Sequence, residues 1–347
     1  MQALACRVVT GELKTDEGNG TERMPVSREE VLWCYRNLLK RNPESEAALN
    51  SHLGNKSFRQ LVEGFVRSPE FADKTRPSVP PPVRKDRFYP LNLKGMEVDT
   101  EATTEQLVQA IGKVKTAWTH LGAVKPHFSV ITDQQFLPAN IGDSIDRFWA
   151  SGEAEATDVQ RILERQKFSD LSRKTCVEYG CGVGRVTMGL ARRFRTTHGY
   201  DISNGHLAHA RQRAQQIAQR NVVFHQCSND LLADLEKCDF FYSRIVFQHN
   251  PPPIIAELIR QSLKAVNPGG IAIFQIPTYG FGYRFVLEEW LAAAQVLDMQ
   301  MHCLPQEKVF SLIAEAKCVP LEVREDNATG AADKYISNTF VVRKNVG

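Results

Sequence analysis

Residues 177–184 read Val-Glu-Tyr-Gly-Cys-Gly-Val-Gly, so one acid and three alternating glycines, Gly180, Gly182 and Gly184, stand within eight positions. The apolar start of this run predicts a strand, and the glycines predict a tight turn into a helix. Seventeen residues beyond Gly184, the stretch His-Gly-Tyr-Asp-Ile-Ser predicts a second strand that ends at Asp201. An open α/β sheet builds its pocket for an adenosine-containing ligand in this way, at the carboxyl ends of its strands.

The glycine spacing narrows the class of ligand. The dinucleotide fingerprint needs its third glycine one position after Gly184, and Arg185 stands there. The strict alternation therefore disfavours a pyrophosphate-containing dinucleotide and favours a different adenosyl ligand.

Length and charge exclude some function classes. The chain has 347 residues, which is enough for two domains, and 42% of them are hydrophobic. Its 43 basic and 40 acidic residues give a net charge of +3, which is too even to favour nucleic acid or a membrane surface as partner. No run of 18 apolar residues and no signal peptide is evident, so we expect a cytoplasmic protein without a membrane span.

The cysteines predict neither a metal site nor a disulfide framework. They show no Cys-x-x-Cys pair and no zinc spacing. We expect buried, reduced thiols, as in a cytosolic protein. The eight are Cys6, Cys34, Cys176, Cys181, Cys227, Cys238, Cys303 and Cys318.

The first quarter of the chain predicts a small separate unit. Residues 1–24 are polar and aperiodic, so we expect a disordered tail. A small helical module is predicted over 25–75, beginning at the capping box of Ser27 and Glu30. Residues 76–90 form a proline-rich linker, which favours an extended conformation.

Residues 91–169 are predicted to form a helical and lid region. One amphipathic helix carries Leu107, Ile111, Val114 and Trp118 on its apolar face, and a second is predicted at Ala156–Gln166. We expect the segment 126–152, together with 279–304, to form a lid over an acceptor pocket.

Residues 170–347 alternate between strands and helices, which indicates a parallel sheet covered by helices. The predicted strands are Thr175–Tyr179, Thr197–Asp201, Val222–Cys227, Asp239–Val246, Gly270–Pro277, Leu321–Asp326 and Ser337–Lys344. The predicted helices are Gly184–Phe194, Ser203–Arg220 and Pro253–Val266.

The last two strands are predicted to be antiparallel, because the ten residues between them are too few for a parallel crossover. The expected fold class is therefore α/β, with a doubly wound, mostly parallel seven-stranded sheet and an antiparallel terminal strand, preceded by a small all-α module.

The ordered set of motifs resembles the class I S-adenosylmethionine-dependent methyltransferases. It comprises Glu178-x-Gly-x-Gly-x-Gly184, Asp201, the strand at Asp239, Pro268-Gly-Gly270 before a strand, and the terminal hairpin, and it covers about residues 170–345. The segment Tyr35–Pro43, with Ser68-Pro-Glu-Phe71, is similar to a helical module found beside bacterial glycan-modifying enzymes.

The resemblance implies S-adenosyl-L-methionine as cofactor and assigns residues to it. Gly180, Gly182 and Gly184 would let the backbone approach the ligand, and a helix starting near Gly184 would point its N–H groups at the ligand's carboxylate. Glu178 would lie near the methionyl amine, and Asp201 would accept from both ribose hydroxyls.

Two further residues are implied to reach the adenine amino group, Asn229 and Asp230, with Asp230 favoured. Each assignment has a structural alternative. Glu178 can be a salt-bridged core acid, and Asn229 or Asp230 can cap a short helix.

A general base is needed only when the acceptor must lose a proton. His249 follows the predicted fourth strand, Tyr279 and Tyr283 follow the fifth, and His302 ends the segment after it. These are the candidate catalytic residues, and packing roles are the alternative for each.

The favoured function is methyl transfer to an oxygen or nitrogen of a small-molecule or glycan-like acceptor. Gln248-His-Asn-Pro251 replaces the Asn-Pro-Pro-Tyr motif of many nucleic-acid amino-methylating enzymes, which makes a nucleic acid acceptor less favoured. A non-catalytic cofactor-binding scaffold and a nicotinamide-dependent oxidoreductase are the alternatives. The sequence makes no prediction of the oligomeric state.

Overall fold

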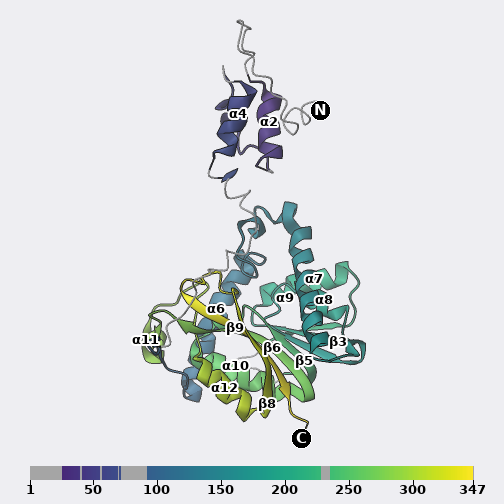
Figure 1. Ribbon diagram of the computed structural model, residues 1–347, viewed down its shortest axis with the longest axis vertical. Coiled ribbons are helices and arrows are strands. Elements are labelled where there is room, and N and C mark those ends of the chain that lie inside the picture. The colour runs from purple at the N-terminus through teal and green to yellow at the C-terminus, as the bar shows by residue number, and fades with distance from the viewer. Residues whose placement is uncertain are drawn as a thin grey trace. The chain divides into compact units, whose positions relative to one another are not determined.

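The computed structural model describes residues 26–39, 41–54, 57–68, 70–71, 92–227 and 235–346. The chain divides into two compact units, residues 1–93 and 94–347 (Figure 1). The predicted tail at 1–24 and linker at 76–90 lie outside the described residues, as do Asn229 and Asp230.

The N-terminal unit contains the predicted small helical region. Its helices are α2 (Arg28–Asn37), α3 (Glu46–Asn50) and α4 (Phe58–Val66). The predicted capping box is present, because Ser27 Oγ accepts from the Glu30 N–H and the Glu30 carboxylate accepts from the Ser27 N–H. The apolar core of this unit includes Val31, Cys34, Tyr35, Leu39, Leu49, Leu61 and Phe65.

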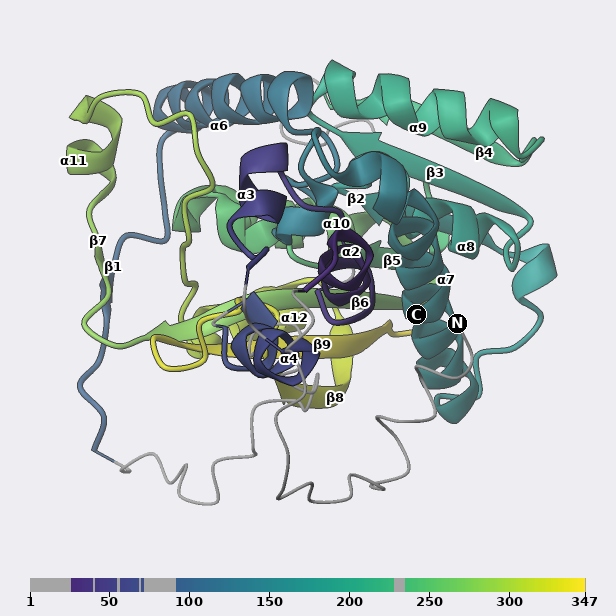
Figure 2. The same ribbon diagram turned by 90° about the horizontal axis from the view of Figure 1, so that it is seen from above.

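The larger unit is built on a seven-stranded sheet with strand order β4-β3-β2-β5-β6-β9-β8 (Figure 2). β9 runs antiparallel to both β6 and β8, and the remaining pairs are parallel. The predicted fold class is therefore confirmed, including the antiparallel hairpin at the end. The strands are β2 (Thr175–Tyr179), β3 (Thr196–Asp201), β4 (Val222–Gln226), β5 (Cys238–Ser243), β6 (Val266–Gly280), β8 (Cys318–Asp326) and β9 (Tyr335–Lys344).

The end of β5 differs from the prediction, which continued this strand to Val246. β5 stops at Ser243 because Ile245 adopts a left-handed conformation with φ of 57°. The Ile245 N–H donates to Gln275 Oε1 at 2.9 Å instead of to a neighbouring strand. This turn directs the segment after Ser243 across the end of the sheet.

Helices cover both faces of the sheet. α6 (Thr104–Val124), α10 (Pro252–Ala265) and α12 (Gln306–Glu315) share one apolar core, whereas α7 (Ile141–Arg165) and α8 (Thr187–Ala191) share another. Phe240 and Phe241, which are neighbours on β5, belong to different cores because successive strand residues point to opposite faces. α9 (Asn204–Gln216) connects β3 to β4.

The two predicted lid segments have regular structure. The segment 126–152 contains a short 3-10 helix (Gln134–Phe136) and the start of α7. The segment 279–304 contains β7 (Arg284–Phe285), which pairs in parallel with β1 (Glu97–Val98), and α11 (Leu287–Ala292). Two more 3-10 helices lie at Leu171–Arg173 and Phe247–His249.

α7 is much longer than the predicted helix Ala156–Gln166, because it starts at Ile141 and runs for 25 residues. Its middle lies directly against the glycine loop, which is the turn of residues 180–186 after β2. A β-carbon on Gly152 would clash there with the carbonyl oxygen of Arg185. The predicted division at residue 169 does not coincide with the division between compact units, which falls at residue 93.

The described parts of the chain contain no helix that is both long and apolar enough to cross a membrane. Cys6 lies outside the described residues. The other seven cysteines are all buried and form no disulfide, as expected for reduced thiols.

We expect Gly152→Ala to lower the free energy of unfolding by about 1–3 kcal/mol, because the added methyl group overpacks the contact between α7 and the glycine loop. Gly142→Ala, on the same helix, is the matched control, since a β-carbon there meets nothing within 4 Å. That control should be neutral or stabilise by up to about 1 kcal/mol, because alanine favours helix more than glycine does. Chemical denaturation of both variants tests the contact, and equal effects would contradict it.

Candidate functional site

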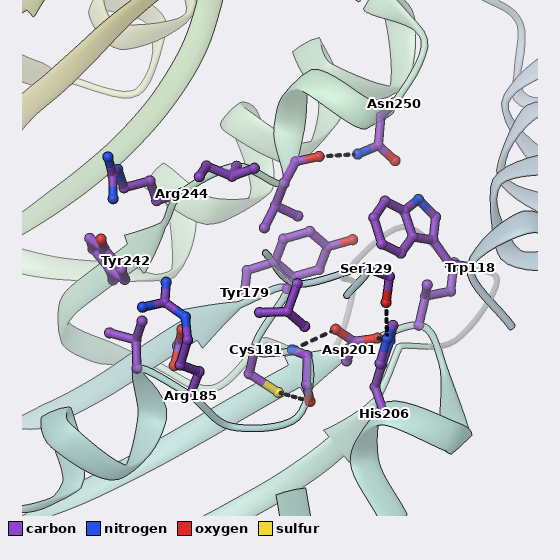
Figure 3. Close-up of a pocket in the computed structure, with 18 of the residues that line it drawn as sticks. Trp118, Ser129, Tyr179, Cys181, Arg185, Asp201, His206, Tyr242, Arg244 and Asn250 are labelled. Atoms are coloured by element: carbon purple, nitrogen blue, oxygen red, sulfur yellow. Dashed lines mark hydrogen bonds and ion pairs between the residues drawn. The ribbon is translucent and has the colours of Figure 1, made fainter. Parts of the chain in front are cut away.

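A cleft lies where the carboxyl ends of β2, β3 and β5 meet (Figure 3). Within the sheet, β3 and β4 lie on one side of β2, and β5, which follows them in the chain, lies on the other side. The strand order therefore reverses direction at β2. Ligands of open α/β sheets bind at this type of reversal point. The residues that line the cleft include Glu178, Gly180, Gly182, Asp201, Arg244 and Asn250.

The glycine loop needs glycine at its alternating positions for two reasons. Gly180, Gly182 and Gly184 have φ values of 75°, 54° and 83°, a region that other residues rarely adopt. A β-carbon on Gly180 would clash with Val246, and one on Gly182 would lie 2.6 Å from Val130 Cγ2. The loop therefore combines left-handed turns with close approach of the segments that cover it.

Asp201 connects the glycine loop to the second strand. Its Oδ2 accepts from the Gly182 N–H at 2.8 Å, and its Oδ1 accepts from the Ser203 N–H at 2.8 Å. The residue is buried, at 7% exposure. Because each carboxylate oxygen can accept two hydrogen bonds, both oxygens keep the capacity to bind a hydroxyl group.

His206 stands beside this carboxylate. Its Nε2 forms a hydrogen bond with Ser129 Oγ at 2.8 Å, and its Nδ1 lies 3.6 Å from Asp201 Oδ1. Among the described residues, this buried Nδ1 has no hydrogen-bond partner. Buried polar atoms are normally paired, so an unpaired one at a cleft is a mark of a ligand position.

Glu178, near the end of β2, is buried and accepts a hydrogen bond from Thr187 Oγ1 at 2.6 Å. Burial raises the pKa of this carboxyl from 4.5 to about 8, against the lowering effect of the Thr187 hydrogen bond. Glu178 is therefore protonated at neutral pH in the free protein. No ion pair to Glu178 occurs within the described ranges, which disfavours the alternative of a salt-bridged core acid.

A cluster of charges closes one end of the cleft. Glu155 of α7 accepts from Arg185 Nη2 at 2.6 Å and from the Tyr242 hydroxyl at 2.6 Å, and it lies 3.2 Å from Arg244 Nη1. Two guanidinium groups thus share one carboxylate, which leaves this end positive. Arg185 is buried, at 8% exposure, and its Nε has no partner among the described residues.

Sequence reasoning missed this cluster. Arg185 was noted only as the residue that replaces a dinucleotide-type glycine, and Glu155 lies 30 residues before it. The only local signal is the polar pair Ser243-Arg244 at the end of a buried strand.

The predicted helix Gly184–Phe194 is reduced in the structure to α8, five residues that start at Thr187. The loop from Gly184 to Val186 precedes it because Gly184 takes a left-handed conformation that a helix cannot include. The helix therefore starts three residues later than predicted, and the expectation that its N–H groups face the ligand's carboxylate stays a prediction.

The predicted catalytic residues are not assembled around the cleft. His249 lines an adjoining pocket, where its Nδ1 lies 2.8 Å from the Gln300 carbonyl oxygen and its ring packs 5.4 Å from that of Trp118. Trp118 lines both this pocket and the cleft, so His249 reaches the cleft only through the indole. Burial lowers the pKa of His249.

Tyr279 and His302 lie further from the cleft. The Tyr279 hydroxyl donates to the Lys94 carbonyl oxygen at 2.8 Å. His302 is buried with its Nδ1 3.0 Å from the Tyr283 hydroxyl, and burial lowers the pKa of His302 to about 3. Neither side chain is among those that line the cleft.

Of the two predicted lid segments, the first, 126–152, contributes Ser129 and Val130 to the cleft.

Comparison with known proteins identifies the domain that carries the cleft. Residues 176–270 match the family described as "Methyltransferase domain". The chain is 30% identical over 141 residues to the ubiquinone biosynthesis O-methyltransferase of Hydrogenovibrio crunogenus, covering 40% of this chain and 56% of that protein. It is 31% identical over 139 residues to the trans-aconitate 2-methyltransferase of Deinococcus radiodurans, covering 39% and 48%. The chain therefore spans about half the length of these relatives.

Solved structures with a similar chain trace include methyltransferases. Magnesium protoporphyrin IX methyltransferase from Synechocystis PCC 6803 with bound SAM has 15% identity and a TM-score of 0.47, covering 69% of this chain and 97% of that one. TehB from Haemophilus influenzae has 15% identity and a TM-score of 0.39, covering 55% and 62%. The predicted resemblance is confirmed at the level of this match: residues 176–270 match a methyltransferase domain, and the unit that contains them has the predicted Rossmann-like sheet.

Glu178 makes stability depend on pH. The unfolded chain releases this proton near pH 4.5, whereas the folded chain holds it up to about pH 8. Raising the pH across this window therefore favours unfolding, by up to about 1.4 kcal/mol per pH unit. Glu178→Gln stays neutral throughout and removes this dependence.

We expect the free energy of unfolding of the natural protein to fall relative to that of Glu178→Gln as the pH rises from about 5 to about 8. Urea unfolding of both proteins at several pH values measures the difference. Parallel curves for the two proteins would show that Glu178 titrates normally.

Proposed function

We propose that the protein is an enzyme that binds S-adenosylmethionine in this cleft and transfers its methyl group to a small-molecule acceptor. The observation that carries the proposal is the Asp201 corner. A buried carboxylate, fixed to the glycine loop at 2.8 Å, keeps unused acceptor capacity on both oxygens and stands beside an unpaired His206 Nδ1. The two hydroxyls of a ribose match this set of groups.

The adenosine end of the ligand is assigned to the side of the cleft at β3. The ribose hydroxyls donate to Asp201, and one of them also reaches His206 Nδ1, which has no hydrogen-bond partner among the described residues. The adenine contact stays with Asn229 and Asp230 as predicted from the sequence. Both of these residues lie outside the described ranges.

The methionyl end is assigned to the side of the cleft that holds Glu178 and Arg185. The ligand's ammonium group would face Glu178, whose carboxyl loses its proton when a cation lies beside it. The ligand's carboxylate would face the positive end, where Arg185 Nε is buried without a partner. Opposite charges therefore meet at both positions.

The methyl donor already carries an activated carbon, because the methyl group is bound to a sulfonium. The protein's contribution is to hold donor and acceptor in line, and fixed geometry of this kind is worth about 7–11 kcal/mol in intramolecular reactions. Trp118, which lines the cleft and packs on His249, is one such positioning group. His249 acts through Trp118 in this account.

The acceptor class is an oxygen or nitrogen nucleophile on a small molecule. The names of the two relatives, an O-methyltransferase of ubiquinone biosynthesis and a trans-aconitate methyltransferase, support a small molecule. A glycan-like acceptor rests only on the resemblance of the N-terminal module to one found beside glycan-modifying enzymes.

We expect Asp201→Asn to weaken binding of S-adenosylhomocysteine by about 100-fold, because loss of a charged hydrogen-bond acceptor costs about 1.5–3 kcal/mol. In addition, the asparagine carries an NH2 group where the aspartate has one of its oxygens. Two donors would therefore face each other at either the Gly182 or the Ser203 N–H. Isothermal titration calorimetry measures the affinity. Asp170→Asn is the matched control, since Asp170 is exposed and lies outside the cleft lining.

The intact protein should show saturable binding of S-adenosylhomocysteine and no competition by NAD. Absence of binding by the intact protein would contradict the proposed function. Equal affinities of Asp201→Asn and the intact protein would contradict the ribose assignment alone.

Ligand binding should release close to one proton at pH 7, because Glu178 is protonated in the free protein and ionised beside the ligand's ammonium group. Calorimetry in buffers of different ionisation enthalpy measures this number. Glu178→Gln should release none. Equal proton release by both proteins would contradict the assignment of Glu178 to the ligand's ammonium group.

A further inference from the structure

A second groove adjoins the cleft and shares three of its residues, Glu155, Tyr242 and Arg244. Half of its remaining lining is apolar, and the polar half is Asp158, Ser243, Gln275 and Thr339. The apolar side chains on this face of the sheet are Val159 and Ile162 of α7 and Ile273 of β6, because the neighbouring Phe274 packs in the core on the other face. The groove therefore adjoins the cleft at Tyr242 and Arg244, which lie away from Asp201 and His206 (Figure 3).

Glu155 is held by three donors, Arg185, Tyr242 and Arg244. One guanidinium group is enough to balance the charge of Glu155, so the second leaves an excess of one positive charge where the cleft and the groove meet. Arg185 is the more tightly held of the two, because it is buried and also donates to Ser151 Oγ at 3.3 Å. The excess charge is thus best placed on Arg244.

Arg244 has donors to spare. Its side chain is 37% exposed, and within the described ranges only its Nη1 has an ion-pair contact, at 3.2 Å from Glu155. A guanidinium group offers five N–H donors in one plane, and two neighbouring donors can bind one carboxylate group. Arg244 can therefore hold Glu155 and still present a two-donor edge to a ligand.

The other acids around the groove are engaged elsewhere. Asp326, whose charge also acts on Arg244, accepts from Thr339 Oγ1 at 2.7 Å and from the Ala328 N–H at 2.9 Å. Asp158 at the rim is 68% exposed and pairs with Arg161 at 2.9 Å. Neither carboxylate forms an ion pair with Arg244 among the described residues.

The described lining of the cleft and groove has no free base beside Arg244. Glu178 is assigned to the ligand's ammonium group, and the Tyr242 phenol is buried and donates to Glu155. His206 lies on the ribose side, against Asp201 and Ser129. An alcohol acceptor must lose a proton on methylation, whereas a carboxylate is ionised at neutral pH and needs no base.

We propose that this groove binds the acceptor, that the acceptor is a small carboxylic acid with an apolar body, and that Arg244 holds its carboxylate for methylation on oxygen. The inference rests on the proposed function, since it places the acceptor beside the donor in the neighbouring cleft. One carboxylate oxygen pairs with Arg244, and the apolar body packs between α7 and β6.

The group transfer balances without a proton acceptor. The free carboxylate oxygen forms a bond to the methyl carbon, and the bond from that carbon to sulfur breaks. Its electron pair stays on sulfur, which turns the sulfonium into the thioether of S-adenosylhomocysteine. The acceptor leaves as a neutral methyl ester, so no oxidant, reductant or base is required.

Binding of simple acids to the protein saturated with S-adenosylhomocysteine tests the inference. Hexanoate, benzoate and phenylacetate, each compared with its primary amide, are suitable probes in calorimetric titrations. We expect at least one acid to bind about tenfold or more tightly than its amide, because a charged pair with Arg244 exceeds a neutral hydrogen bond.

Arg244→Met should weaken binding of that acid by about tenfold or more, and it should weaken binding of S-adenosylhomocysteine less, because Arg185 remains to face the carboxylate of that ligand. Arg244→Lys keeps the charge but loses the planar edge. Its affinity for the acid should therefore lie between those of the unchanged protein and Arg244→Met. Arg324→Met is the matched control, since it removes an arginine that is 61% exposed and pairs with Glu322. This control should change neither affinity.

Transfer of a labelled methyl group to the acid that binds gives the second readout. The expected product is a methyl ester, which releases labelled methanol in alkali, whereas ethers and methylamines keep the label. Failure of every acid to bind, equal binding of acids and amides, or a product stable to alkali would overturn the inference.

Arg244 has one competing partner, the carboxylate of the methyl donor itself. If Arg244→Met weakens binding of S-adenosylhomocysteine as much as binding of the acid, without affecting 5′-methylthioadenosine, which lacks the amino-acid tail, Arg244 belongs to the cofactor and the inference is wrong. Absence of S-adenosylhomocysteine binding by the unchanged protein would instead contradict the proposed function.

Discussion

The hydrogen bond from the Gly182 N–H to the Asp201 carboxylate is the contact on which the site depends. It joins the turn after β2 to the end of β3, and the second oxygen of the same carboxylate fixes the start of α9 through the Ser203 N–H. A buried carboxylate is costly unless it is hydrogen-bonded, and two backbone donors meet that cost while leaving lone pairs for a ligand. The same group therefore stabilises the empty loop and prepares it to bind hydroxyl groups.

α7 provides the second constraint, because it closes the cleft from outside the core sheet. Gly152 lets the helix contact the backbone of Arg185, and one turn later Glu155 gathers Arg185, Tyr242 and Arg244. The small residues Ala156 and Gly189 continue this close approach, since a β-carbon on Gly189 would lie 2.6 Å from that of Ala156. Packing of small residues thus sets where the positive end of the cleft stands.

The sequence predicted the sheet and the place of Asp201 at the end of its second strand because both are local. Strand lengths, the glycine turn and the carboxylate at Asp201 follow from residues close together in the chain, and the short final connection requires an antiparallel pair. The charge cluster was not predictable in this way. Glu155 lies 87 residues before Tyr242, and no periodic pattern connects them. The early end of β5 was hidden as well, because Ile245 takes a left-handed conformation that a β-branched residue rarely adopts. His249 and His302 had suitable chemistry, but their side chains turn into packing and backbone contacts that only the fold reveals.

A crystal structure of the protein with S-adenosylhomocysteine tests the central claim most directly. The account predicts both ribose hydroxyls within hydrogen-bond distance of the Asp201 carboxylate, with the Gly182 contact retained and the amino-acid tail directed toward Glu178 and Arg185. A ligand bound elsewhere, or one whose ribose makes no contact with Asp201, would contradict it.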